Sequence, residues 1–211
     1  MFESIFFVFL AACVYACFDN SEFKKLLDSK SKQHLFLGFS TGLAMLWSIQ
    51  TSIYAGLNVH FLWLTACTLF LGFRLAIFAG LFALTISYFF VSQAWYEFAL
   101  HFVSGVFVPV SVSYLIFSYS YHHLPRHFFT YIFVASFLAG AASIICKMFS
   151  LAVFYYSGGQ YDWQTLTDNY LILLLLLSFP EALLNGMTMT IGVIYFPNTV
   201  RTFSDKQYLD S

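Results

Sequence analysis

Charged residues are scarce in this chain. Asp, Glu, Lys and Arg make up only 9% of the 211 residues, whereas a soluble domain carries about a quarter. A soluble domain of this size would need far more charge to cover its surface, so this class is excluded. The formal net charge of −1 also gives no electrostatic basis for binding nucleic acid.

Motifs for several kinds of chemistry are also absent from the sequence. It contains no glycine-rich phosphate-binding loop, no cysteine pairs at zinc-finger spacing, and no intramembrane protease motif. The four cysteines, Cys13, Cys17, Cys67 and Cys146, all lie within apolar stretches, which favours small buried side chains over disulfides. We therefore expect neither an enzyme nor a permanently bound cofactor.

Apolar residues are correspondingly abundant. They make up 60% of the chain, aromatic residues make up 22%, and the mean hydropathy is +0.78. This composition predicts an all-α polytopic membrane protein embedded in a lipid bilayer, because about 20 apolar residues form one membrane-spanning helix. The apolar stretches predict seven spans in a single transmembrane domain, 1–211, at about residues 2–18, 34–53, 59–73, 75–91, 95–119, 128–156 and 170–195. The stretch 59–73 is short for a complete span.

The basic residues predict how these spans are oriented. With seven crossings, eight of the nine fall on one side: Lys24, Lys25, Lys30, Lys32, Arg74, Arg126, Arg201 and Lys206. The loops on the other side carry no Lys or Arg. Because cytoplasmic loops are enriched in basic residues, the N terminus is expected outside and the C terminus in the cytoplasm.

The ninth basic residue, Lys147, lies within an apolar span, where an ionisable side chain is costly. Glu181 lies at a similar predicted depth in the next span, and Asn185 follows it one turn later on the same helix face. These residues predict an intramembrane polar group in which Lys147 and Glu181 can pair. Such a pair would either lock two helices together or take part in transport.

Two histidines near the predicted outer face form a second polar group. His60 opens the third span, and His101 lies in the fifth span, four residues after Glu97. Imidazole binds nickel, copper and zinc well, and a carboxylate can ligate the ion or orient the ring. His60, His101 and Glu97 are thus candidate ligands of a metal ion captured from outside, whereas helix-bridging hydrogen bonds are the alternative role for each histidine.

Three segments, 123–133, 179–187 and 200–209, resemble a group of proteobacterial membrane proteins described as energy-coupling-factor transporter permeases. This group is distantly related to the substrate-binding components of cobalt and nickel uptake systems. The resemblance extends over nearly the whole chain, and it implies a substrate-capture subunit of the bacterial inner membrane. It further implies two kinds of partner, a transmembrane coupling subunit and ATPase subunits.

The cobalt and nickel proteins hold their metal through the terminal amine, a histidine at position two, and a histidine that ends a glycine-rich motif. The segment Tyr54-Ala-Gly-Leu-Asn-Val-His60 is similar to that last motif, which implies a ligand role for His60, and Glu181 resembles a glutamate of their last helix. The histidine at position two has no counterpart, because this chain begins Met1-Phe2. Either His101 substitutes for it or the substrate is not a metal.

The sequence therefore predicts a subunit that captures a transition-metal ion such as cobalt or nickel as its substrate. Two alternatives remain open. One is transport of a non-metal small molecule, and the other is an assembly protein that binds another membrane protein. A polar cavity containing His60, His101 and Glu97 would favour transport.

Overall fold

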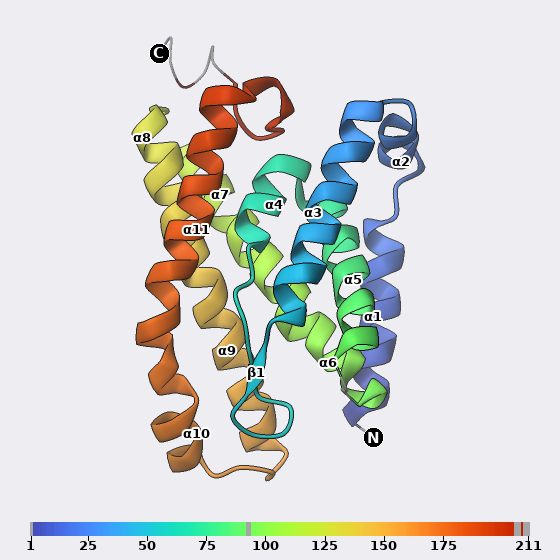
Figure 1. Cartoon of the computed structure of the whole chain (residues 1–211), viewed down its shortest axis with the longest axis vertical. Helices are drawn as coiled ribbons and strands as arrows, with labels where there is room; N and C mark the ends of the chain where they lie inside the picture. The colour runs from blue at the N-terminus through green and yellow to red at the C-terminus, as the bar shows by residue number, and fades with distance from the viewer. Residues whose placement is uncertain (1, 92–93, 205–207, 209–211) are drawn as a thin grey trace.

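The computed structural model describes residues 2–91, 94–204 and 208. Its long helices run along the long axis of one bundle, and α1 (Phe2–Cys17) begins at the opposite end of it from the end where α11 (Leu174–Tyr195) finishes (Figure 1). In chain order the main helices are α1 (Phe2–Cys17), α2 (Asn20–Leu27), α3 (Lys30–Ser48), α4 (Leu64–Leu71), α5 (Phe73–Phe90), α6 (Phe98–Phe102), α7 (Val108–His123), α8 (Phe128–Thr130), α9 (Ala139–Ser157), α10 (Trp163–Asn169) and α11 (Leu174–Tyr195).

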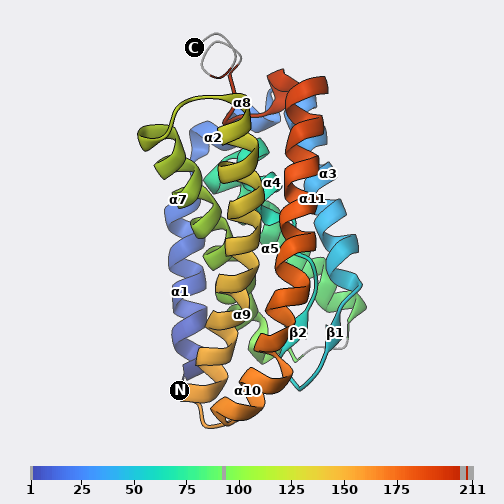
Figure 2. The ribbon, with the colours of Figure 1, turned by 90° about the vertical axis from the view of Figure 1, so that its left-hand side faces the viewer.

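Short segments of other geometry complete the helical columns. Val103–Phe107 and Tyr131–Leu138 are π-helical and join α6 to α7 and α8 to α9, while Trp95–Glu97, Leu171–Leu173 and Pro197–Thr199 are 3₁₀ turns. Two strands of two residues each, β1 (Thr51–Ser52) and β2 (Asn58–Val59), pair antiparallel, with Thr51 opposite Val59. They form a hairpin at the end of the bundle where α1 begins (Figure 2).

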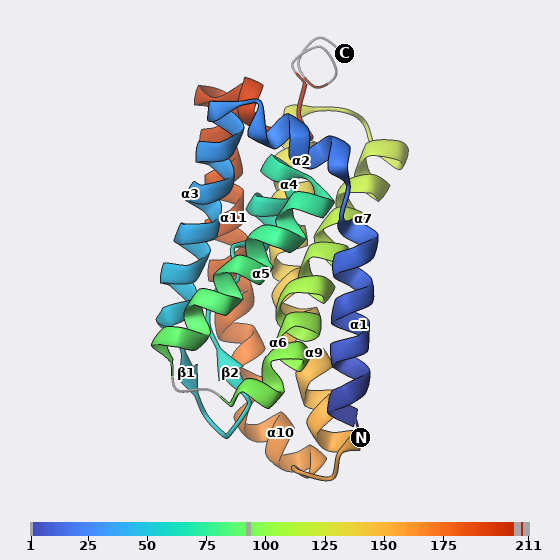
Figure 3. The same ribbon diagram turned by 90° about the vertical axis from the view of Figure 1, so that its right-hand side faces the viewer.

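The third predicted span, 59–73, is not one membrane-length helix. The chain rises from the hairpin as a non-helical segment, and a helix forms only at α4, which has eight residues and ends at Gly72 (Figure 1). All eight residues of α4 are buried, and α4 packs against α5, α7, α9 and α11. Figure 3 shows α4 between α3 and α7, near the end of the bundle where α2 lies. A short, non-helical crossing is tolerated here because protein, not lipid, surrounds it.

The all-helical membrane architecture is confirmed, but the count of seven membrane-length helices is not reached in the part of the chain that the structure describes. Four helical columns are long and apolar enough to cross a membrane: Phe73–Phe90, Phe98–His123, Phe128–Ser157 and Trp163–Tyr195. The pair α1 and α2, bent by 66°, adds a fifth candidate. Helix α3 has 19 residues but begins with Lys30 and Lys32, which lowers its hydropathy, and α4 is too short.

Large apolar side chains cover much of the outer surface. Leu175 on α11 is 85% exposed and Phe89 on α5 is 74% exposed. Exposed apolar area on this scale is unfavourable in water but suits contact with lipid tails. The bundle therefore has an apolar exterior as well as an apolar core.

Candidate functional site

The start of α4 is held by two buried polar side chains of α11. The Glu181 carboxylate accepts hydrogen bonds from the backbone amides of Leu62 and Trp63, each at 2.8 Å. Asn185 accepts one from the amide of Ala66 at 2.8 Å and donates to Glu181 Oε1 at 2.7 Å. The amides at a helix start have no partner within the helix, and a negative charge there is favourable. Glu181 and Asn185 thus cap α4 from across the bundle.

Trp63, directly before α4, has a left-handed backbone conformation that two hydrogen bonds hold in place. Its φ of 55° is the one positive value at a non-glycine residue in the described part of the chain, and a left-handed conformation costs an L-residue about 1–2 kcal/mol. Its indole donates to the Thr188 hydroxyl at 2.8 Å, and its amide donates to Glu181. These two bonds fix the turn by which the non-helical segment enters α4.

Lys147 on α9 has a different partner from the one that the sequence allowed. Its ammonium donates to the backbone carbonyl of Asn58 at 2.5 Å, and it is 2% exposed. The ion pairs among the described residues are Lys25–Glu22, Arg74–Asp19 and Arg201–Glu22, so the structure contains no direct Lys147–Glu181 pair. The non-helical segment between α3 and α4 offers carbonyls to the lysine and amides to the glutamate, so the two charges bind backbone groups of opposite polarity.

His101 and His60 both lie beside this non-helical segment. His101 Nδ1 is hydrogen-bonded to the Tyr88 hydroxyl at 2.7 Å, and His101 Nε2 faces the carbonyl of Gly56 at 3.3 Å. His60 donates from Nδ1 to the carbonyl of Phe61 at 3.1 Å. Since a carbonyl can only accept, the proton of neutral His60 is on Nδ1, and Nε2 keeps its lone pair.

Side chains from four other parts of the fold thus bind backbone carbonyls of residues 55–62. Besides Lys147 and His101, Tyr161 donates to Ala55 at 3.0 Å and the Trp47 indole donates to Leu62 at 3.2 Å. Backbone without helix or sheet must find partners when it is buried at membrane depth. Holding this segment in place is therefore one physical role of these polar residues.

Gly56 marks the tightest point of the segment. Its φ is +80°, and a Cβ at this position would meet the Tyr155 hydroxyl at 1.8 Å. Only glycine fits such a conformation and such a close approach. The glycine of the Tyr54–His60 motif therefore allows the turn that places His60.

A small cavity of about 20 Å³ lies between these elements. This volume accommodates about one water-sized particle. Its described lining residues are Trp47, Gln50, Asn58, His60, Leu84, Ser87, His101, Ser104, Gly105, Lys147 and Leu151. Both histidines, His60 and His101, line it, together with the polar side chains of Gln50, Asn58, Ser87, Ser104 and Lys147.

Glu97 is placed differently from the two histidines. It is not among the described residues that line the cavity, and its carboxylate accepts a hydrogen bond from the Tyr155 hydroxyl at 3.4 Å. No three His, Cys, Asp or Glu residues come together in a metal-binding geometry within the described ranges. Because one helical turn lies between Glu97 and His101, the shared helix face did not ensure a shared site.

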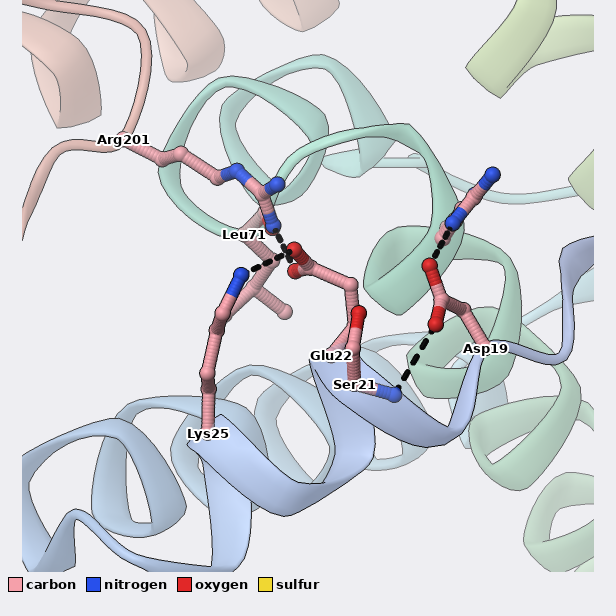
Figure 4. A network of polar contacts seen from close by, with 7 residues as sticks. Asp19, Ser21, Glu22, Lys25, Leu71 and Arg201 are labelled. Atoms are coloured by element: carbon pink, nitrogen blue, oxygen red, sulfur yellow. Dashed lines mark hydrogen bonds and ion pairs between the residues drawn. The ribbon is translucent and has the colours of Figure 1, made fainter.

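The opposite end of the bundle carries a network of charges on α2 (Figure 4). Arg201, which follows α11, donates to Glu22 at 2.6 Å and to the carbonyl of Leu71 at 3.2 Å. The hydrogen bond from Arg201 holds the pKa of Glu22 below its usual value. Arg74 bonds Asp19, which caps α2 through the amide of Ser21. This network ties α2, α4 and the segment after α11 together at one end.

Sequence reasoning missed several residues of the site. Asn58 and Tyr88 are the main examples: Asn58 supplies the carbonyl for Lys147, and its own amide oxygen accepts from Ser52 at 2.6 Å. Tyr88 orients His101. Their only sequence signal was position, since Asn58 lies two residues before His60 and Tyr88 is a polar group within an apolar span.

Comparison with known proteins shows which family has this architecture. The family model described as cobalt uptake substrate-specific transmembrane region (CbiM) matches residues 4–196. No curated protein and no solved structure matches the chain. The matched region contains every helix from α2 to α11 and the whole polar cavity. The chain belongs to the family of cobalt uptake substrate-specific transmembrane regions.

Proposed function

We propose that this chain is the membrane-embedded substrate-capture component of an energy-coupling-factor uptake transporter in the bacterial inner membrane, and that its substrate is a transition-metal ion such as cobalt or nickel. One observation carries the proposal. Two histidines from separate elements, His60 before α4 and His101 on α6, line one polar cavity with room for about one small particle.

The chemistry of the cavity supports an ion rather than a larger substrate. Imidazole nitrogens suit cobalt, nickel, copper and zinc, and a vitamin-sized molecule needs a pocket of several hundred Å³. Asn58 of the hairpin lines the cavity, and the hairpin lies at the end of the bundle where α1 begins (Figure 1). This end faces outward in the orientation predicted from the basic residues, so an ion would enter from outside.

Transport then needs partners. The sequence has no phosphate-binding loop of its own, and we propose that a transmembrane coupling subunit and ATPase subunits supply the energy. The competing proposal is an assembly protein. It is supported by the hydrogen bonds from Lys147, His101 and Glu181 to the non-helical segment, because they give these polar residues a structural role without a ligand. The polar cavity favours metal capture over that role.

Metal binding by the detergent-purified protein tests the proposal. Mass spectrometry gives the metal content, and titration calorimetry compares nickel, cobalt, copper and zinc. We expect one ion per chain, with binding lost in His60→Ala and in His101→Ala. His127→Ala is the matched control, because His127 is exposed and lies outside the cavity.

Two results would contradict the proposal. Folded wild-type protein that binds none of the four ions would favour an assembly role. Binding that is unchanged in His60→Ala would move the ion to another site. A thermal unfolding curve for each variant separates loss of binding from loss of fold.

A further inference from the structure

The cavity contains a third nitrogen donor, the amine of a lysine side chain. Lys147 lines the same cavity as His60 and His101, and no carboxylate is among the described lining residues. All three side chains line a cavity of about 20 Å³, which has room for about one water-sized particle, so they converge on one small space. We propose that the Lys147 amine is a metal ligand, and that the ion is held by Lys147 Nζ and the Nε2 atoms of His60 and His101. This inference rests on the proposed capture of a transition metal.

The hydrogen bonds already present leave the required lone pairs. His60 uses Nδ1–H on the carbonyl of Phe61, so its Nε2 can bind an ion. This is the usual arrangement of a ligating histidine, in which a backbone carbonyl orients the ring through the other nitrogen. Neutral Lys147 likewise keeps one lone pair while it donates a hydrogen to Asn58.

His101 supplies its nitrogen by changing tautomer. With the proton on Nδ1, the ring donates to the Tyr88 oxygen at 2.7 Å, and the Nε2 lone pair then faces the Gly56 carbonyl oxygen at 3.3 Å. An ion bound at this Nε2 therefore takes the place of the hydrogen bond between His101 and the Gly56 carbonyl.

Binding at Lys147 is balanced by the loss of one proton. The ammonium releases a proton to water, and the lone pair that this exposes forms the bond to the ion, as deprotonation of a ligand normally accompanies metal binding. Replacing an ammonium by a divalent ion raises the charge of the cavity by one unit.

Isotope labelling tests the assignment in the unaltered chain. The protein is produced with lysine that carries ¹⁵N at Nζ, loaded with copper(II), and examined by pulsed electron paramagnetic resonance. We expect a strong ¹⁵N coupling from a directly bound nitrogen, in addition to the ¹⁴N couplings of two imidazoles. The same labelled protein with Lys147→Met should lose the ¹⁵N coupling, although its other lysines remain labelled. This loss would assign the coupling to Lys147.

The outcomes separate this inference from the proposed function. Copper bound through two imidazoles without a ¹⁵N coupling would overturn the role of Lys147 and leave metal capture intact. Tighter metal binding in Lys147→Met would also overturn it, because the lysine would then be a competing cation. If the folded wild-type protein binds neither copper nor any other of the four ions, the proposed function itself fails. Lys147→Arg provides a second variant, which retains a donor to Asn58 but has no lone pair, and we expect it to lose binding at least tenfold.

Discussion

Replacement of Glu181 tests whether this residue is the cap that holds α4. Glu181→Leu removes the acceptor for the amides of Leu62 and Trp63, both at 2.8 Å. A buried donor left without an acceptor costs about 1–3 kcal/mol, so the two amides together cost about 2–6 kcal/mol. Loss of the negative charge at the start of α4 adds about 0.3–1 kcal/mol.

A graded series makes the expectation sharper. Glu181→Gln keeps the shape and one acceptor oxygen, but its NH₂ group meets the second amide, so we expect about half the loss, about 1–3 kcal/mol. Asn185→Leu leaves the amide of Ala66 without its acceptor and falls in the same range. Thr190→Val is the matched control on α11, because the Thr190 hydroxyl donates only to the Gly186 carbonyl of its own helix, and it should cost less than about 1 kcal/mol.

The free energy of unfolding in bicelles, measured by steric trapping, decides the question. The expected order of stability is wild type and Thr190→Val above Glu181→Gln, with Glu181→Leu lowest. If Glu181→Leu and Glu181→Gln both remain within about 1 kcal/mol of wild type, the amides of Leu62 and Trp63 do not depend on this carboxylate. The capping argument would then be wrong.

Three further predictions concern other parts of the molecule. Gly56→Ala should abolish metal binding and destabilise the protein by about 1–3 kcal/mol, whereas Gly38→Ala, where a Cβ meets nothing within 4 Å, should be neutral or slightly stabilising in the same unfolding assay. Arg201 lowers the pKa of Glu22, so the Arg201–Glu22 pair stabilises the fold fully above pH 4.5, the unfolded pKa, and this stabilisation is lost as the pH falls below 4.5. Arg201→Gln should remove about 0.2–1 kcal/mol of stability at pH 7. It should also flatten the dependence of stability on pH below about 5. Cysteine labelling from outside intact cells should modify a cysteine placed in the loop 158–162 and not one at the C terminus, and the reverse result would invert the predicted orientation.

The sequence predicted the architecture where the physical signal is local. Long apolar stretches specify the columns that contain α5, α7, α9 and α11, because length and hydropathy are properties of the segment itself. The same reasoning singled out Lys147, since an ionisable group within such a stretch is expensive wherever it points. These expectations needed no knowledge of partners.

The form of the third span could not be predicted in this way. Its start is stabilised by Glu181, which lies 119 residues away from Leu62 in the chain, and no local pattern records such a bond. No direct ion pair between Lys147 and Glu181 forms among the described residues, for the same reason. Two opposite charges at similar depth attract each other in a regular helical bundle, but a buried non-helical segment offers each of them a closer backbone partner.

The polar residues of this membrane domain therefore belong to its fold and its candidate site at the same time. A carboxylate binds amides, and an amine and an imidazole bind carbonyls, so the segment from β1 to α4 is stable without a helix of its own. The segment also brings His60 into the cavity with His101 and Lys147. Binding an ion at these nitrogens must weaken the hydrogen bond from His101 to Gly56, since one ring nitrogen cannot both donate a hydrogen and bind a metal. Metal capture should therefore loosen one of the bonds that hold the segment in place, and a faster hydrogen exchange near Gly56 in the metal-bound protein is the consequence that follows from this geometry.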